Sequence, residues 1–235
     1  MTRAESLIEM LMEAGGQEAG VLEIASMTLK QATDYMEKRK FDWQKEIPDF
    51  VKNFKAAQKK AKAGWTVRRE MPVIEDRDVR QLQQRLKNGK IDIEKPFAKT
   101  TNPKNPFPQG LQGFDAKDFV ERGLKDGSKT DDQVKVRNVR ARVGDLIPIQ
   151  KQIYFEKSIG KTVENGMKAS LDFIKNGFLI ISADKYIIDG HHRFLQGVII
   201  DPDMKVGALE IDLPIKKLLP MSVAYSDAIG NKRNE

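Results

Sequence analysis

The sequence predicts an α+β protein in which a C-terminal domain with a small mixed sheet and flanking helices follows a mostly helical N-terminal region. Apolar residues recur at helical spacing before residue 94, Pro and Gly accumulate in the middle of the chain, and short β-rich runs appear after residue 133. We therefore expect a helical region over 1–94, a Pro/Gly-rich linker with a short helix over 95–133, a mixed domain over 134–221 and a polar tail over 222–235.

The N-terminal region carries three helical patterns. Residues 3–40 have apolar side chains at helical spacing on both sides of a Gly-Gly pair at 15–16, which predicts a helical hairpin. A Pro-Asp pair at 48–49 begins the second pattern, which ends near Gly64. The third pattern, over 75–87, stops at an Asn-Gly pair.

The pattern changes to short strands at residue 134. β-branched residues over 134–143 predict a first strand, and Gly166 to Asn176 is expected to be a helix. Two strands with a turn between them are expected over 178–188, followed by a helix that starts at His191 or His192. A last strand over 206–212 and a short helical turn over 214–219 complete the expected domain.

Composition limits the classes of protein. The 235 residues include no cysteine, which excludes disulfides and thiolate metal sites, and two histidines are too few for a His-rich metal site. The chain has no apolar run of about 20 residues, the length that spans a bilayer. Glu5, Glu9 and Glu13 stand where a signal peptide would be positively charged. We therefore expect no membrane partner and a cytoplasmic location.

Most of the net charge of +7 lies in one short segment. Four lysines at spacings of three, four and three share one face of the helix expected after Pro48, and two arginines follow it. Such a face suits sequence-independent binding to nucleic acid phosphates, and it would equally suit an acidic protein surface or a solvated helix face. The candidate residues are Lys52, Lys55, Lys59, Lys62, Arg68 and Arg69.

The strongest candidate site is the run from Asp189 to Arg193. Both histidines of the chain lie here, at the exit of an expected strand and the start of an expected helix, directly after Gly190. A helix N-terminus presents N–H groups that have no partner within the helix and a partial positive charge, and glycine lets the backbone approach a ligand closely. Arg193 adds a bidentate donor for phosphate, and the imidazoles add hydrogen-bond donors or a proton shuttle. The pattern predicts a phosphate-binding loop.

A purely structural role for this run is the alternative. Asp189 would then cap the helix, Arg193 would pair with an acid, and the histidines would be ordinary surface groups. A metal site at the pair is disfavoured, because adjacent helical side chains point about 100° apart. For the same reason, only one of His191 and His192 is expected to contact a transferred phosphate.

The run from Tyr186 to Leu195 resembles the signature loop of ParB/sulfiredoxin-like domains, and its Gly-His-His-Arg form is similar to that of free serine kinases and of many phage proteins. The segment from Val143 to Gln150 resembles the opening element of the same family. The resemblance covers residues 134–221. It implies a nucleotide-phosphate pocket that serves CTP hydrolysis or phosphotransfer in different members.

Residue roles follow from the resemblance by position. Gly190, His191, His192 and Arg193 would line the phosphates of ATP, ADP or CTP, with Mg²⁺ as the expected companion ion. Gln150 would lie at the mouth of the pocket. A kinase also needs a base for the acceptor proton, and Glu156 is the candidate by location, with Asp184 and Asp189 as further candidates.

The sequence leaves three functions open. The first is a phosphotransferase or nucleotide hydrolase that acts in the loop at 189–193. The second is a ParB-like nuclease or DNA-binding protein, although no cluster of carboxylates for two metal ions is evident. The third is a non-enzymatic phage structural or host-interaction protein. A phage origin would place the chain in the host cytoplasm or in the virion, and the oligomeric state stays open.

Overall fold

The computed structural model of the chain describes residues 22–93, 113–121 and 132–234. Residues 3–21 of the expected hairpin and most of the expected linker lie outside these ranges. The described elements are, in chain order, α2 (Leu29–Lys38), α3 (Trp43–Glu46), α4 (Phe50–Lys62), the 3₁₀ turn η1 (Arg68–Glu70), α5 (Asp76–Lys87), α7 (Gly113–Glu121), β1 (Val136–Arg142), the 3₁₀ turn η3 (Val143–Asp145), β2 (Ile147–Pro148), α8 (Phe155–Asn176), β3 (Phe178–Ser182), β4 (Tyr186–Asp189), α9 (His191–Ile200), β5 (Lys205–Ile211) and α10 (Ile215–Ala228).

Local sequence accounts for the N-terminal helices. Thr28 caps α2 through a capping box with Gln31, which satisfies backbone donors at the helix start. Asp49 is the N-cap of α4, as the Pro-Asp pair predicts. The apolar stripe of α4 is buried and its lysine face is exposed. The helices predicted after Pro48 and Glu75 are therefore confirmed.

The five strands form one mixed sheet in the order β1-β5-β3-β4-β2. β1 pairs antiparallel with β5 and β3 with β4, whereas β3–β5 and β2–β4 are parallel. The described chain is thus α+β with a small mixed sheet, as predicted. Glu210 of β5 forms ion pairs with Arg137 of β1 and with Lys185 in the turn between β3 and β4, which links β5 to both.

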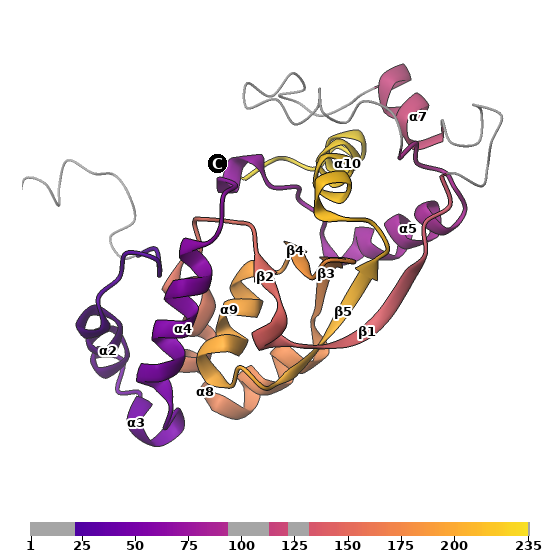
Figure 1. Ribbon diagram of the computed structural model, residues 1–235. Helices are drawn as coiled ribbons and strands as arrows, with labels where there is room; N and C mark the ends of the chain where they lie inside the picture. The colour runs from indigo at the N-terminus through magenta and orange to yellow at the C-terminus, as the bar shows by residue number, and fades with distance from the viewer. Residues whose placement is uncertain (1–21, 94–112, 122–131, 235) are drawn as a thin grey trace, which may run out of the picture.

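Helices cover both faces of the sheet, as Figure 1 shows. Leu179 and Ile181 of β3 belong to a core with α4, α8 and α9, whereas Ile180 between them belongs to a second core with α5 and α10. This alternation follows from the twofold side-chain period of a strand. The sheet is therefore the middle layer of three.

Both cores combine residues from the two sides of the expected boundary at residue 133. Phe50 and Phe54 of α4 pack in the first core with Phe194 of α9, and Leu82 of α5 packs in the second with Leu218 of α10. The described part of the N-terminal region therefore shares its cores with the mixed sheet.

The helix before β3 is longer than predicted. Residues 166–176 are helical as expected, but α8 begins at Phe155 and changes direction at Gly166, whose φ of 83° is non-helical. The first half escaped prediction because small or polar residues, Ser158, Gly160 and Thr162, lie on its buried face. These residues give no apolar periodicity.

The polar tail predicted over 222–235 is wrong for its first half. α10 continues to Ala228, and residues 222–227 are buried. Three of the buried residues, Ser222, Ser226 and Asp227, are polar, which is why the sequence predicted a polar tail here. Asp227 is neutralised by Arg233, which permits its burial. No helix among the described residues is long and apolar enough to cross a membrane.

Tyr225 of α10 provides a test of this packing. Its side chain is fully buried, and its hydroxyl has no hydrogen-bond partner among the described residues. Burial also raises the pKa of Tyr225 to about 12. We expect Tyr225→Phe to raise the free energy of unfolding by about 1 kcal/mol, because it removes an unpaired buried hydroxyl. Tyr225→Ala should lower it by about 3–5 kcal/mol by leaving a cavity. Urea denaturation measures both, and a destabilised Tyr225→Phe would contradict the packing.

Candidate functional site

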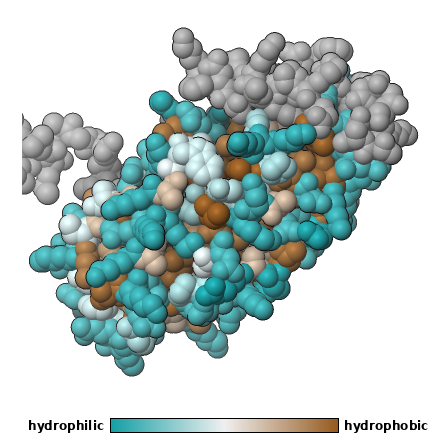
Figure 2. Space-filling view, in the orientation of Figure 1, coloured by the Kyte–Doolittle hydropathy of each residue, from teal (hydrophilic) through white to brown (hydrophobic). Residues whose placement is uncertain are grey.

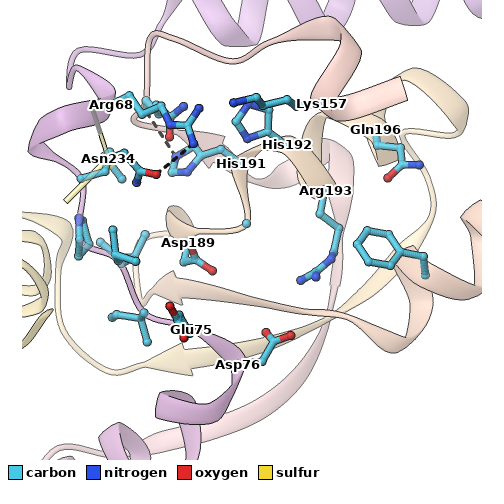
Figure 3. Close-up of a pocket in the computed structure, with 18 of the residues that line it drawn as sticks. Arg68, Glu75, Asp76, Lys157, Asp189, His191, His192, Arg193, Gln196 and Asn234 are labelled. Carbon is cyan, nitrogen blue, oxygen red and sulfur yellow. Dashed lines mark hydrogen bonds between the residues drawn. The ribbon is translucent and has the colours of Figure 1, made fainter. Parts of the chain in front are cut away.

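A cavity of about 400 Å³ opens at the N-terminus of α9, where the sequence predicts the phosphate-binding loop (Figure 3). It is bordered by β4, α8, α9, the segment from η1 to the start of α5, and the C-terminal end of the described chain. Its lining residues are Arg68, Met71, Pro72, Val73, Ile74, Glu75, Asp76, Gln150, Lys157, Lys161, Phe173, Ile188, Asp189, Gly190, His191, His192, Arg193, Gln196 and Asn234. All five residues of the predicted run are among them.

Gly190 makes the turn from β4 into α9. Its φ of 93° lies in the left-handed region, which other residues adopt at a cost, and a Cβ there would meet the Leu179 side chain at 2.4 Å. Gly190 is the N-cap of α9 and offers no side chain to the first-turn N–H groups. The helix start therefore faces the cavity without a side-chain cap, as an anion-binding helix end does.

His191 holds the neighbouring strand in place. Its buried ring accepts hydrogen bonds at Nε2 from the backbone N–H groups of Ile149 and Gln150, both at 3.3 Å. Burial lowers the pKa of His191 to about 3, with a smaller contribution from His192. The ring is therefore neutral near pH 7 and carries its proton on Nδ1.

His192 makes a similar contact one residue later. Its Nε2 accepts the N–H of Tyr154, the N-cap of α8, at 3.2 Å, and its ring stacks on the Tyr154 ring. Burial and then the charges of Arg68 and Lys157 lower the pKa of His192 to about 4. Both histidines thus fix the connection from β2 to α8 and stay neutral.

Arg193 extends toward the opposite end of the cavity, where Asp76 lies (Figure 3). Its Nη1 donates to the carbonyl of Phe178 at 2.6 Å, and its guanidinium lies 4.8 Å from the centre of the Phe173 ring. The Nε of Arg193 is buried and has no hydrogen-bond partner among the described residues. Gly177 makes this position possible, because a Cβ there would lie 2.4 Å from Nε.

Asp189 is a cavity-lining carboxyl group with a raised pKa. Burial raises the pKa of Asp189 to about 6, while a backbone hydrogen bond from Gly190 and the charge of Arg193 oppose the rise. The negative charge of Asp76 adds to the rise. A carboxylate with a pKa near the working pH is an effective general base.

Two other residues that were predicted to belong to the site differ in their location. Gln150 is buried in the cavity wall, where its N–H contacts His191 and its side chain donates to the Gln152 carbonyl. Glu156 does not line the cavity; its carboxylate lies 3.9 Å from Arg39 on the side of α2. Of the candidate bases Glu156, Asp184 and Asp189, only Asp189 therefore lines the cavity.

The sequence patterns did not assign several of the cavity-lining residues to the site. Lys157 and Lys161 are four residues apart on the unpredicted half of α8, and Phe173 follows farther along it. Arg68 was assigned to the basic stripe, but it lines the cavity and donates to Asn234 at 3.0 Å. The spacing of the two lysines was a usable signal, but it required the helix to be predicted first.

The lysine stripe itself has the predicted geometry. Lys52, Lys55, Lys59 and Lys62 are all exposed on α4, and Arg69 is exposed after it. The face of the molecule in Figure 2 is mostly hydrophilic, with hydrophobic residues in small separate areas. The stripe is thus a solvent-facing row of charge that does not contribute to the cavity.

No group of three or more His, Cys, Asp or Glu side chains in the described ranges is arranged to hold a metal ion. The comparisons with known proteins add no relative: no protein-family model matches the chain, and no curated protein or solved structure does either. The case for a function therefore rests on the cavity.

The buried histidines predict how stability depends on pH. Between pH 6.5 and about 3, the unfolded chain binds a proton at His191 that the folded chain does not, so the free energy of unfolding falls as the pH is lowered. His191→Gln keeps an acceptor for the two N–H groups but does not titrate. We expect its free energy of unfolding to fall less than that of the wild type between pH 7 and pH 4. The exposed-site variant Val51→Ala is the control, and an unchanged pH dependence in His191→Gln would show that His191 is not buried in neutral form.

Proposed function

We propose that this chain binds a nucleoside di- or triphosphate in the cavity and transfers or hydrolyses its terminal phosphate. The observation that carries the proposal is the meeting of an uncapped helix N-terminus with four cationic side chains around one cavity. Backbone N–H groups at a helix start and charged donors together form an anion site of the kind that phosphates occupy. The cations are Arg68, Lys157, Lys161 and Arg193.

The division of roles follows from the geometry. The α9 N-terminus and Arg193 bind the phosphates and stabilise the charge that develops on them, which is the main requirement in phosphoryl transfer. Asp189 accepts the proton of the attacking hydroxyl or water. His191 and His192 act as positioning residues, because their Nε2 atoms are engaged by backbone N–H groups.

Mg²⁺ would enter with the nucleotide. The described residues offer no complete metal cage, but Mg²⁺ is commonly held by phosphates, water and one or two carboxylates. Glu75 and Asp76 line the cavity and supply such carboxylates. The ion would neutralise phosphate charge there.

The support for a ParB/sulfiredoxin-like identity comes from two short segments of the chain. The resembling run forms the β4–Gly190–α9 turn, and the second resembling segment, around β2, lies beside it through the His191 contacts. We propose this family relationship on that juxtaposition. It favours a nucleotide as the phosphate carrier.

Two cavity variants test the function. Arg193→Ala should weaken nucleotide binding by about 1.5–3 kcal/mol, because it removes a charge-assisted contact. Asp189→Asn should bind nucleotide but lose about 10²- to 10⁴-fold in turnover, together with the limb of the pH–rate profile near pH 6. Calorimetry with each nucleoside di- and triphosphate and a phosphate-release assay measure the two effects.

Two controls make that result specific. Arg69→Ala removes an exposed arginine outside the cavity and should bind nucleotide as the wild type does. Glu156→Gln removes the base first expected from the sequence, which lies outside the cavity, and should keep full turnover. A wild type that binds no nucleotide would overturn the proposal.

A second candidate function is sequence-independent binding to nucleic acid, and the exposed lysine row on α4 favours it. Changing all four lysines to Gln should reduce the log–log salt slope of binding by roughly 0.7 to 0.9 for each phosphate that a lysine neutralises in the complex. The matched control removes four exposed lysines elsewhere, namely Lys87, Lys90, Lys135 and Lys216. Equal slopes for the two quadruple variants, measured by fluorescence anisotropy, would mean that only net charge matters.

A further inference from the structure

A second hollow of about 370 Å³ lies between α5 and the sheet, next to the phosphate cavity. Asp76, Val79, Arg80 and Gln83 recur at helical spacing on one face of α5 and form one side of it. Phe178 and Leu209 of the sheet are among the apolar residues that line it. We call this hollow the α5 groove.

The α5 groove presents an aromatic ring with carboxamides around it. Phe178, the first residue of β3, is 47% exposed although it lies on the same face of the sheet as the buried Ile180. Asn138, Asn176 and Gln83 also line the groove, and their side chains make no hydrogen bond to another described residue. An exposed ring beside amide groups that can both donate and accept is suited to a flat heteroaromatic ligand.

The α5 groove adjoins the phosphate cavity at two points. Asp76 lines both. Arg193, which lines the cavity, donates to the carbonyl of Phe178, which lines the groove. One ligand can therefore place its phosphates at the α9 N-terminus and an organic part beyond Arg193.

We propose that the α5 groove binds the base of the nucleotide, with the ring of Phe178 as its stacking surface and the carboxamides as its hydrogen-bonding partners. This inference rests on the proposed function, because it needs the phosphates in the adjacent cavity. An aromatic side chain can stack on any base, whereas Asn and Gln discriminate between bases through the donors and acceptors on the edge of the base. Phe178 therefore sets affinity, and Asn138, Asn176 and Gln83 set the choice of base.

Calorimetry with two probes tests the groove: the nucleoside triphosphate that the wild type binds most tightly, and inorganic tripolyphosphate, which has no base. Phe178→Ala should weaken nucleotide binding about fivefold to a hundredfold and leave tripolyphosphate binding unchanged. Phe178→Tyr keeps a ring and should restore nucleotide affinity. Trp65→Ala is the matched control, because Trp65 is also 47% exposed and lines neither hollow.

The two probes separate the possible failures. Equal loss of nucleotide and tripolyphosphate binding in Phe178→Ala would mean that Arg193 had moved, and it would overturn the groove. Unchanged binding of both would overturn it as well, while the proposed function would stand. If the wild type binds tripolyphosphate and nucleotide equally well, the base has no site. If it binds neither, the proposed function fails and this inference fails with it.

Discussion

The arrangement of the cavity depends on the buried imidazole of His191. Its Nε2 accepts two backbone N–H groups from the segment directly after β2, and the Ile149 carbonyl in that segment accepts the N–H groups of Trp65 and Thr66 at 2.8 Å. Gly64 lies so close to this segment that a Cβ would be 2.5 Å from the Gln150 carbonyl. The ring thus joins α9 to a segment that itself pairs with residues 64–66, and loss of the ring would leave two buried donors unpaired, at about 1–3 kcal/mol each.

That contact explains why residues distant in sequence share one site. The segment held by His191 leads into α8, which brings Lys157 to the cavity, and it pairs with the segment that carries Arg68. The C-terminal end of the chain lies beside the same segment in Figure 1, where Asn234 accepts a hydrogen bond from Arg68. The N-terminal region and the C-terminal end are therefore parts of the cavity wall, and the motif-bearing turn alone would form only one side of it.

The sequence predicted elements correctly where burial follows an apolar period, except over 22–28, which was expected to be helical and is not, although Ile24 and Met27 are buried there. The strands β3 and β4, the helix that starts at His191 and the amphipathic α4 all meet that condition. The first half of α8 and the second half of α10 do not, because hydrogen-bonded residues such as Ser158, Thr162 and Ser226 fill their buried faces. A similar limit applies to the candidate site. The local run at 189–193 was identified from the sequence, but Arg68 reaches the cavity through tertiary packing that no short sequence pattern encodes.

The neutral histidines also determine the electrostatics of the cavity. Because burial keeps both rings uncharged well below neutral pH, the positive charge of the cavity comes from its arginines and lysines and from the α9 N-terminus. Asp189 is the lining group whose pKa, at about 6, lies close to the physiological range. The positive charge of the cavity and the carboxyl group with a raised pKa thus belong to different residues, which is the arrangement that the proposed phosphate binding and proton exchange would need.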